Sequence, residues 1–111
     1  MATKKQIAKG QARFATPINL DFQVDGRCMR KRRGVYLPIV AENSDGMHTA
    51  RAEKIGLDAF AETRAELAAE VTEQLAMLWK EYAMADDAEL TESARKVKRN
   101  LLATFEEVRD A

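Results

Sequence analysis

The sequence is short of the residues that support covalent, metal or cofactor chemistry. Its 111 residues include one cysteine, Cys28, and one histidine, His48. A lone cysteine excludes an internal disulfide and is typical of a reducing compartment, so we expect a cytoplasmic protein. Neither residue has metal-ligand spacing or an acid–base partner near it in the sequence. We therefore expect no enzymatic activity, no metal site and no cofactor.

Glycine and proline are also scarce, and long apolar runs are missing. The five glycines form no phosphate-binding loop, because Gly26 and Gly34 are too far apart for the dinucleotide or P-loop patterns. No apolar stretch approaches the roughly 18 residues of a membrane span. The first residues, MATKKQIAKGQARFATP, contain lysines but no secretory h-region, so we expect no membrane contact. Length and composition predict a flexible basic tail over 1–12 and a single α+β domain over 13–111.

Two segments have the pattern of β-strands. Residues 17–24 alternate apolar and polar side chains, and residues 34–41 are rich in β-branched and aromatic side chains. The turn dipeptide Asp25-Gly26 follows the first segment. The chain then either returns at once in a tight hairpin, with Phe22 opposite Met29, or forms a long loop. Burying arginines in the tight hairpin is costly, so we favour a hairpin of 17–24 and 34–41 with a projecting tip.

The second half of the sequence is typical of helices. Asn43-Ser44-Asp45-Gly46 predicts a turn, and a short helix over about 47–55 ends at Gly56. Two amphipathic stripes predict long helices over about 58–84 and 87–108, with Asp58 and Asp86 as N-caps. The stripes are out of phase, which favours two antiparallel helices over one continuous rod. The expected fold is therefore a hairpin, a short helix and a helical pair, and its open strand edges favour a homodimer.

The chain is neutral overall, but its charges are divided between the two halves. Residues 1–37 contain nine basic and two acidic residues, whereas residues 38–111 contain nine basic and sixteen acidic residues. The densest basic group lies between the two expected strands: Arg27, Arg30, Lys31, Arg32 and Arg33. Arginine and lysine side chains donate to phosphate oxygens, so this group is the predicted binding site for nucleic acid or another polyanion.

Two functions remain open from the sequence. The first is a small regulatory protein that contacts nucleic acid through the basic hairpin tip. The second is a protein-directed inhibitor or adaptor, of the kind encoded by phages or mobile elements. It would act by occupying a partner's surface with its acidic helices. Acid pairs such as Glu106-Glu107 are expected to lie on a solvated face, and Trp79 and Tyr82 are expected in the core or a dimer interface.

Overall fold

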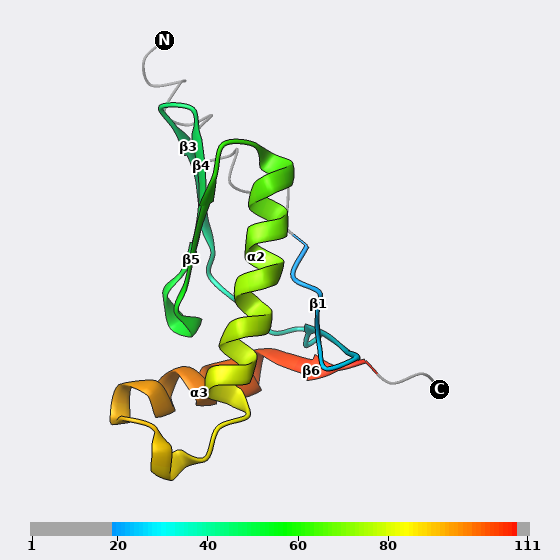
Figure 1. Cartoon of the computed structure of the whole chain (residues 1–111), viewed down its shortest axis with the longest axis vertical. Helices are drawn as coiled ribbons and strands as arrows, with labels where there is room; N and C mark the ends of the chain where they lie inside the picture. Colours follow the sequence, from blue (N-terminus) through cyan, green and yellow to red (C-terminus); the bar gives the residue numbers. More distant parts are fainter. Residues whose placement is uncertain (1–18, 109–111) are drawn as a thin grey trace.

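The computed structural model describes residues 19–108, which form two small sheets around a long helix (Figure 1). Sheet A has the order β1-β2-β6 and sheet B the order β3-β4-β5, and neighbouring strands are antiparallel. The strands are β1 (Phe22–Val24), β2 (Arg27–Lys31), β3 (Val40–Ser44), β4 (Met47–Ala52), β5 (Leu57–Ala61) and β6 (Phe105–Glu107). The helical elements are η1 (Glu53–Ile55), α2 (Arg64–Leu78), the π-helical turn η2 (Trp79–Ala83), η3 (Asp87–Glu89) and α3 (Glu92–Thr104).

This architecture shows that the expected hairpin with two long helices is wrong. The helical pair is replaced by two three-stranded sheets, one 20-residue helical segment (α2 with η2) and the shorter α3. In Figure 1, α2 lies between sheet B and strand β1, and α3 lies across the lower end of α2 rather than antiparallel beside it. The expected tail over residues 1–12 lies outside the described residues.

The first hairpin is the tight one, and its second strand is the basic segment. Asp25 and Gly26 both adopt positive φ, at 52° and 78°, which suits a two-residue turn whose twist matches the flanking strands. Phe22 pairs with Met29 in the resulting register. The strand expected over 34–41 is therefore wrong, because residues 32–39 cross from sheet A to sheet B without pairing. Buried Leu37 anchors this crossing segment to the core.

The short helix expected over 47–55 is strand β4 for most of its length. Asp45 and Gly46 form the turn before it, again with positive φ. Ala50 and Ala52 are fully buried, and they alternate with the more exposed Thr49 and Arg51. Alanine favours helices intrinsically, but here its small side chain lets α2 approach the sheet closely, so tertiary packing overrides propensity. The sole helical piece within 47–55 is η1, which Gly56 ends as expected.

The first long helix starts later than the expected residue 58. Residues Leu57–Ala61 form strand β5, and the Oγ1 atom of Thr63 caps the helix by accepting from the Glu66 amide at 3.1 Å. Gln74 of α2 reaches back to the outer edge of β5. Its side-chain amide accepts from the Asp58 N–H at 3.2 Å and donates to the Asp58 carbonyl at 2.9 Å. The helix thus covers part of an open sheet edge.

The second long helix is also shorter than the expected 87–108. Thr91, rather than Asp86, caps α3, and its Oγ1 atom accepts from the Ala94 amide at 3.1 Å. After Thr104 the chain changes to an extended conformation and forms β6, which pairs with β2. Phe105 is fully buried at this change and packs edge-on against Phe22, with ring centroids 5.2 Å apart.

One apolar core joins both sheets and both helices. Part of the predicted apolar stripe is confirmed, since Leu67, Val71, Leu75 and Leu78 of α2 are all buried. Phe60, which was expected at the start of the same stripe, lies in β5 and is exposed. Other buried members come from sheet A, sheet B and the C-terminal elements: Phe22, Val24, Met29, Ala50, Ala52, Ile55, Leu57, Ala59, Leu101 and Phe105. Within residues 19–108, no helix has the length and apolar character needed to cross a membrane.

Candidate functional site

The five basic residues singled out from the sequence lie in and just after the central strand of sheet A. Arg27, Arg30 and Lys31 belong to β2, and Arg32 and Arg33 follow it. The expected projecting tip is wrong, because β2 is hydrogen-bonded to β1 on one side and to β6 on the other. Met29 alone is buried on this strand, and Arg27 and Arg30 are exposed. The strand therefore keeps its arginine side chains accessible to solvent, while β1 pairs with its first three residues and β6 with its last three.

Strand β6 brings two glutamates beside these arginines. Glu106 pairs with Arg30 in the strand register, and its carboxylate lies 3.0 Å from Arg30 Nε and 3.4 Å from Arg32 Nη1. The Glu107 carboxylate lies 3.7 Å from Arg27 Nη1. The solvated face expected for Glu106-Glu107 is therefore wrong, since both are half-buried partners of the basic cluster. Because these pairs are partly exposed, each contributes little to stability.

Two of the five basic residues also support the fold. The Lys31 ammonium is half-buried and donates to the backbone carbonyls of Arg32 and Val35. The Arg32 amide donates to the Thr104 carbonyl at 2.7 Å, and its Nε donates to the Leu102 carbonyl at 3.2 Å. Arg32 thus satisfies the last carbonyls of α3, where a positive charge is also favourable to the helix dipole. Arg33 is exposed at the following turn and forms no ion pair with any described residue.

Helix α3 supplies basic residues that the sequence interpretation missed. It contains Arg95, Lys96, Lys98 and Arg99 against one acidic residue, Glu92. Residues 38–111 have a negative net charge, and this total conceals the basic residues of α3. A count over each expected helix would have found them.

The four basic side chains of α3 differ in the contacts they make. Lys98 donates to the Ala85 carbonyl at 2.6 Å and to Asp87 Oδ1 at 2.8 Å, and Arg95 donates to the Asp87 carbonyl at 2.9 Å. These two residues therefore hold the connection between the helices. Lys96 and Arg99 are exposed and form no ion pair within residues 19–108. They line a shallow depression of about 570 Å³ together with Lys54 and the two acidic residues Glu53 and Glu92.

The three-dimensional charge distribution differs from the sequence halves. Sheet A and α3, counted over residues 21–33 and 92–107, contain nine basic and five acidic residues, a net charge of +4. Sheet B and α2 with η2, counted over residues 40–83, contain four basic and nine acidic residues, a net charge of −5. The inhibitor hypothesis assumed that both long helices are acidic, but α3 is basic. The basic excess lies on sheet A and α3, and residues 84–91, which α3 binds at Asp87, add three acidic residues beside it.

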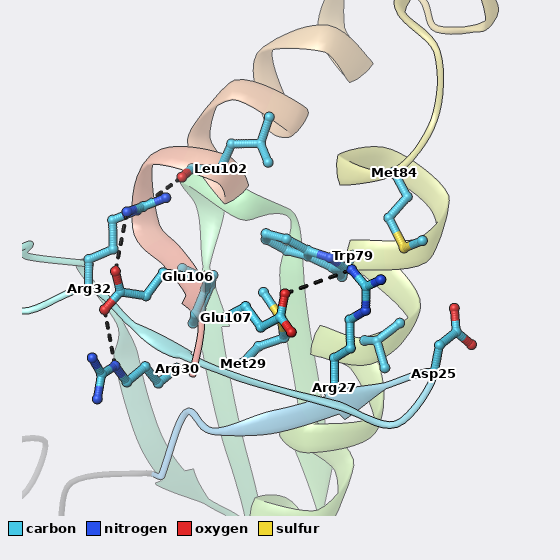
Figure 2. A pocket seen from close by; sticks show the side chains of 12 residues that line it. Asp25, Arg27, Met29, Arg30, Arg32, Trp79, Met84, Leu102, Glu106 and Glu107 are labelled. Carbon is cyan, nitrogen blue, oxygen red and sulfur yellow. Dashed lines mark hydrogen bonds and ion pairs between the residues drawn. The ribbon is translucent and has the colours of Figure 1, made fainter. Parts of the chain in front are cut away.

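A cleft of about 720 Å³ lies where β2 and β6 face the end of the long helix (Figure 2). Arg27, Arg30 and Arg32 line it together with Glu106 and Glu107. Its apolar lining comes from Trp79, Leu102 and Met84, and the last two are 40% and 56% exposed.

The π-helical turn η2 shapes this cleft. The Met84 amide donates to the Trp79 carbonyl, five residues earlier, at 3.0 Å. Such turns recur at functional sites because the wider turn redirects side chains. The Trp79 ring is half-buried and lies on Phe22, with centroids 6.0 Å apart. One side of Trp79 therefore belongs to the core, as expected, and its cleft-facing side is available to a ligand.

The other chemical candidates from the sequence do not gather at this cleft. His48 lies half-buried in β4, in register with Asn43 and Ala61. Cys28 is exposed on β2, where its sulfur accepts a weak hydrogen bond from Gln23 Nε2 at 3.6 Å. Within residues 19–108, no three histidine, cysteine, aspartate or glutamate side chains are grouped as metal ligands.

Comparisons with protein-family models, with curated proteins and with solved structures find no significant match to this chain. The function is therefore argued from its own residues.

Proposed function

We propose that the protein is a non-enzymatic regulatory protein that binds nucleic acid through a basic surface on sheet A and α3. We define this basic surface by the exposed residues Arg30, Arg33, Lys96 and Arg99, together with Arg32. The observation that carries the proposal is the position of Arg32. Its side chain binds the Leu102 carbonyl, three residues after Arg99 on the same helix. Positions three apart are neighbours on a helix, so basic groups far apart in the sequence become adjacent.

The unpaired charges on this surface favour a polyanion as the ligand. Arg33, Lys96 and Arg99 form no ion pair with a described residue, so their donors are available to phosphate oxygens. Lys54 adds a further ammonium group beside Lys96 and Arg99, so the depression holds three basic residues against two acidic ones, Glu53 and Glu92. The acidic side of the molecule, formed by sheet B and α2, would repel the same ligand and so orient it toward the basic surface.

A charge-matched pair of double variants tests this proposal. Lys96→Ala/Arg99→Ala removes two cations from the basic surface, and Arg51→Ala/Arg64→Ala removes two from the acidic side. Binding of a labelled 20-nucleotide probe would be measured by fluorescence anisotropy between about 50 and 300 mM salt. Each lost phosphate contact lowers the salt slope by about 0.7 to 0.9, so the first variant should lose about 1.4 to 1.8 from the slope.

The control variant should keep the wild-type slope and affinity. Far-UV circular dichroism would establish that both variants are folded. The proposal is wrong if wild-type protein binds neither DNA nor RNA at about 50 mM salt. It is also wrong if the two variants lose equal affinity, because binding would then follow total charge rather than this surface.

A protein-directed inhibitor or adaptor is the second candidate, and two exposed apolar side chains of sheet B support it. Phe60 of β5 is 62% exposed and Val40 of β3 is 46% exposed. Both lie on the face of sheet B opposite the buried Ala59 and Leu57, which pack toward α2.

A second copy of this chain is one partner for that face, and the expected homodimer stays a prediction. Light scattering of wild type and Phe60→Ser at micromolar concentration tests it, since a monomeric wild type contradicts a dimer.

A further inference from the structure

We infer that the cleft between β2, β6 and the end of the long helix binds an unpaired nucleobase, so that the nucleic acid is recognised as a single strand. This inference rests on the proposed function and names its substrate class. A volume of about 720 Å³ lies within the range of small-ligand sites, roughly 300 to 1,000 Å³. A phosphate group alone would leave most of this space empty.

The mixed charge of the cleft favours a base over a phosphate. Glu106 and Glu107 carry carboxylates into the same cleft as Arg27, Arg30 and Arg32. A phosphate would be repelled by the carboxylates, whereas a base carries both kinds of hydrogen-bonding group on its edge. Its amino groups can donate to carboxylates, and its ring nitrogens and carbonyl oxygens can accept from guanidinium groups.

The apolar lining favours stacking of the base. Trp79 offers an aromatic ring that is held in place by Phe22 on its core side. Met84 and Leu102 supply exposed apolar side chains from two further positions around the cleft (Figure 2). Aromatic side chains that stack on successive bases are the common device of proteins that bind single strands. A duplex keeps its bases stacked and paired, so it must first release a base to enter such a cleft.

The remaining basic groups fit the strand's backbone. Arg33, Lys96 and Arg99 lie outside the cleft lining and form no ion pair with a described residue, and Glu53 and Glu92 line the depression that holds Lys96 and Arg99. Phosphates that flank the inserted base would therefore meet these cations, while the base occupies the region with both charges. The structure in this way separates the two parts of a nucleotide between two adjoining areas.

Trp79 is the only tryptophan of the chain, so its fluorescence reports directly on the cleft. The full chain would be titrated at about 50 mM salt with a mixed-sequence 20-nucleotide single strand and with the corresponding duplex. Base stacking contributes about 5- to 100-fold in affinity, so the single strand should bind more tightly by that factor and quench Trp79. The duplex should bind more weakly and leave the fluorescence unchanged.

Two matched variants separate cleft binding from general attraction. Met84→Ser alters an exposed side chain of the cleft, and Met77→Ser alters a comparably exposed side chain of α2 outside it. Met84→Ser should weaken single-strand binding severalfold, whereas Met77→Ser should match wild type. Equal affinity for single strand and duplex, without quenching of Trp79, overturns this inference and leaves the proposed function standing. Absence of binding to either probe overturns both.

Discussion

Gln74 provides a direct test of how α2 stabilises the edge of sheet B. Its side-chain amide forms two hydrogen bonds with the backbone of Asp58, at 3.2 and 2.9 Å, where a further strand would otherwise pair. Each such bond contributes about 0.5 to 1.5 kcal/mol, and water partly replaces both at this exposed edge. We therefore expect Gln74→Ala to lower the free energy of unfolding by about 1.5 kcal/mol. The Tm should fall by about 6 to 12 °C, given about 4 to 8 °C per kcal/mol for small domains.

The assay is urea unfolding followed by Trp79 fluorescence, with Glu73→Ala as the control. Glu73 is the preceding residue of the same helix, is exposed, and has a helix propensity close to that of glutamine. The control should therefore unfold close to the wild-type midpoint. Gln74→Ala should also show concentration-dependent association in light scattering, because the uncovered β5 edge can pair with another chain. Equal stability of Gln74→Ala and Glu73→Ala would refute the reasoning.

Two further predictions concern α3. Leu101→Ala removes a fully buried side chain that holds this helix on the core, so it should cost about 2 to 5 kcal/mol in urea unfolding, and a loss below 1 kcal/mol would contradict that packing. The pKa of Asp87 is lowered, first by its hydrogen bond from Lys98 and then by the charge of Lys98. Asp87 therefore stabilises the fold above its ordinary pKa near 4, and this contribution is lost as the pH falls through the lowered value. The stabilities of wild type and Asp87→Asn should accordingly converge between about pH 5 and pH 2, whereas a constant difference would exclude the pair.

The sequence predicted the α+β class, the turn at Asp25-Gly26 and the buried stripe of α2. It also offered the register with Phe22 opposite Met29, but this alternative was set aside because arginines would share the face of β1. No arginine is buried on that face, because β2 is only five residues long. Met29 takes the single interior position of that face, while Arg27 and Lys31 lie at the strand ends and extend their charged groups outward or to backbone carbonyls.

Other elements had no distinct local pattern. Ala50 and Ala52 fit a helix as well as a strand, and only contact with α2 decides between them. Phe105 continues the helical stripe of α3, yet it forms a strand because its backbone meets β2, far away in the sequence. The cleft depends on that same long-range pairing. The basic residues in and after β2 were therefore predictable, whereas their carboxylate partners on β6 and their nearness to the basic residues of α3 were not.

The pairing of β2 with β6 also has a consequence for the order of folding. Strands β3, β4 and β5 and helix α2 are consecutive in the sequence, so their contacts close short loops and can form early. Sheet A is complete only when β6 pairs with β2. This pairing joins residues more than 70 positions apart in the sequence, such as Arg30 and Glu106. Until that slow closure, the arginines of β2 face solvent without their carboxylates. A newly made chain would thus pass through a state in which strand β2 is more strongly positive than in the folded protein.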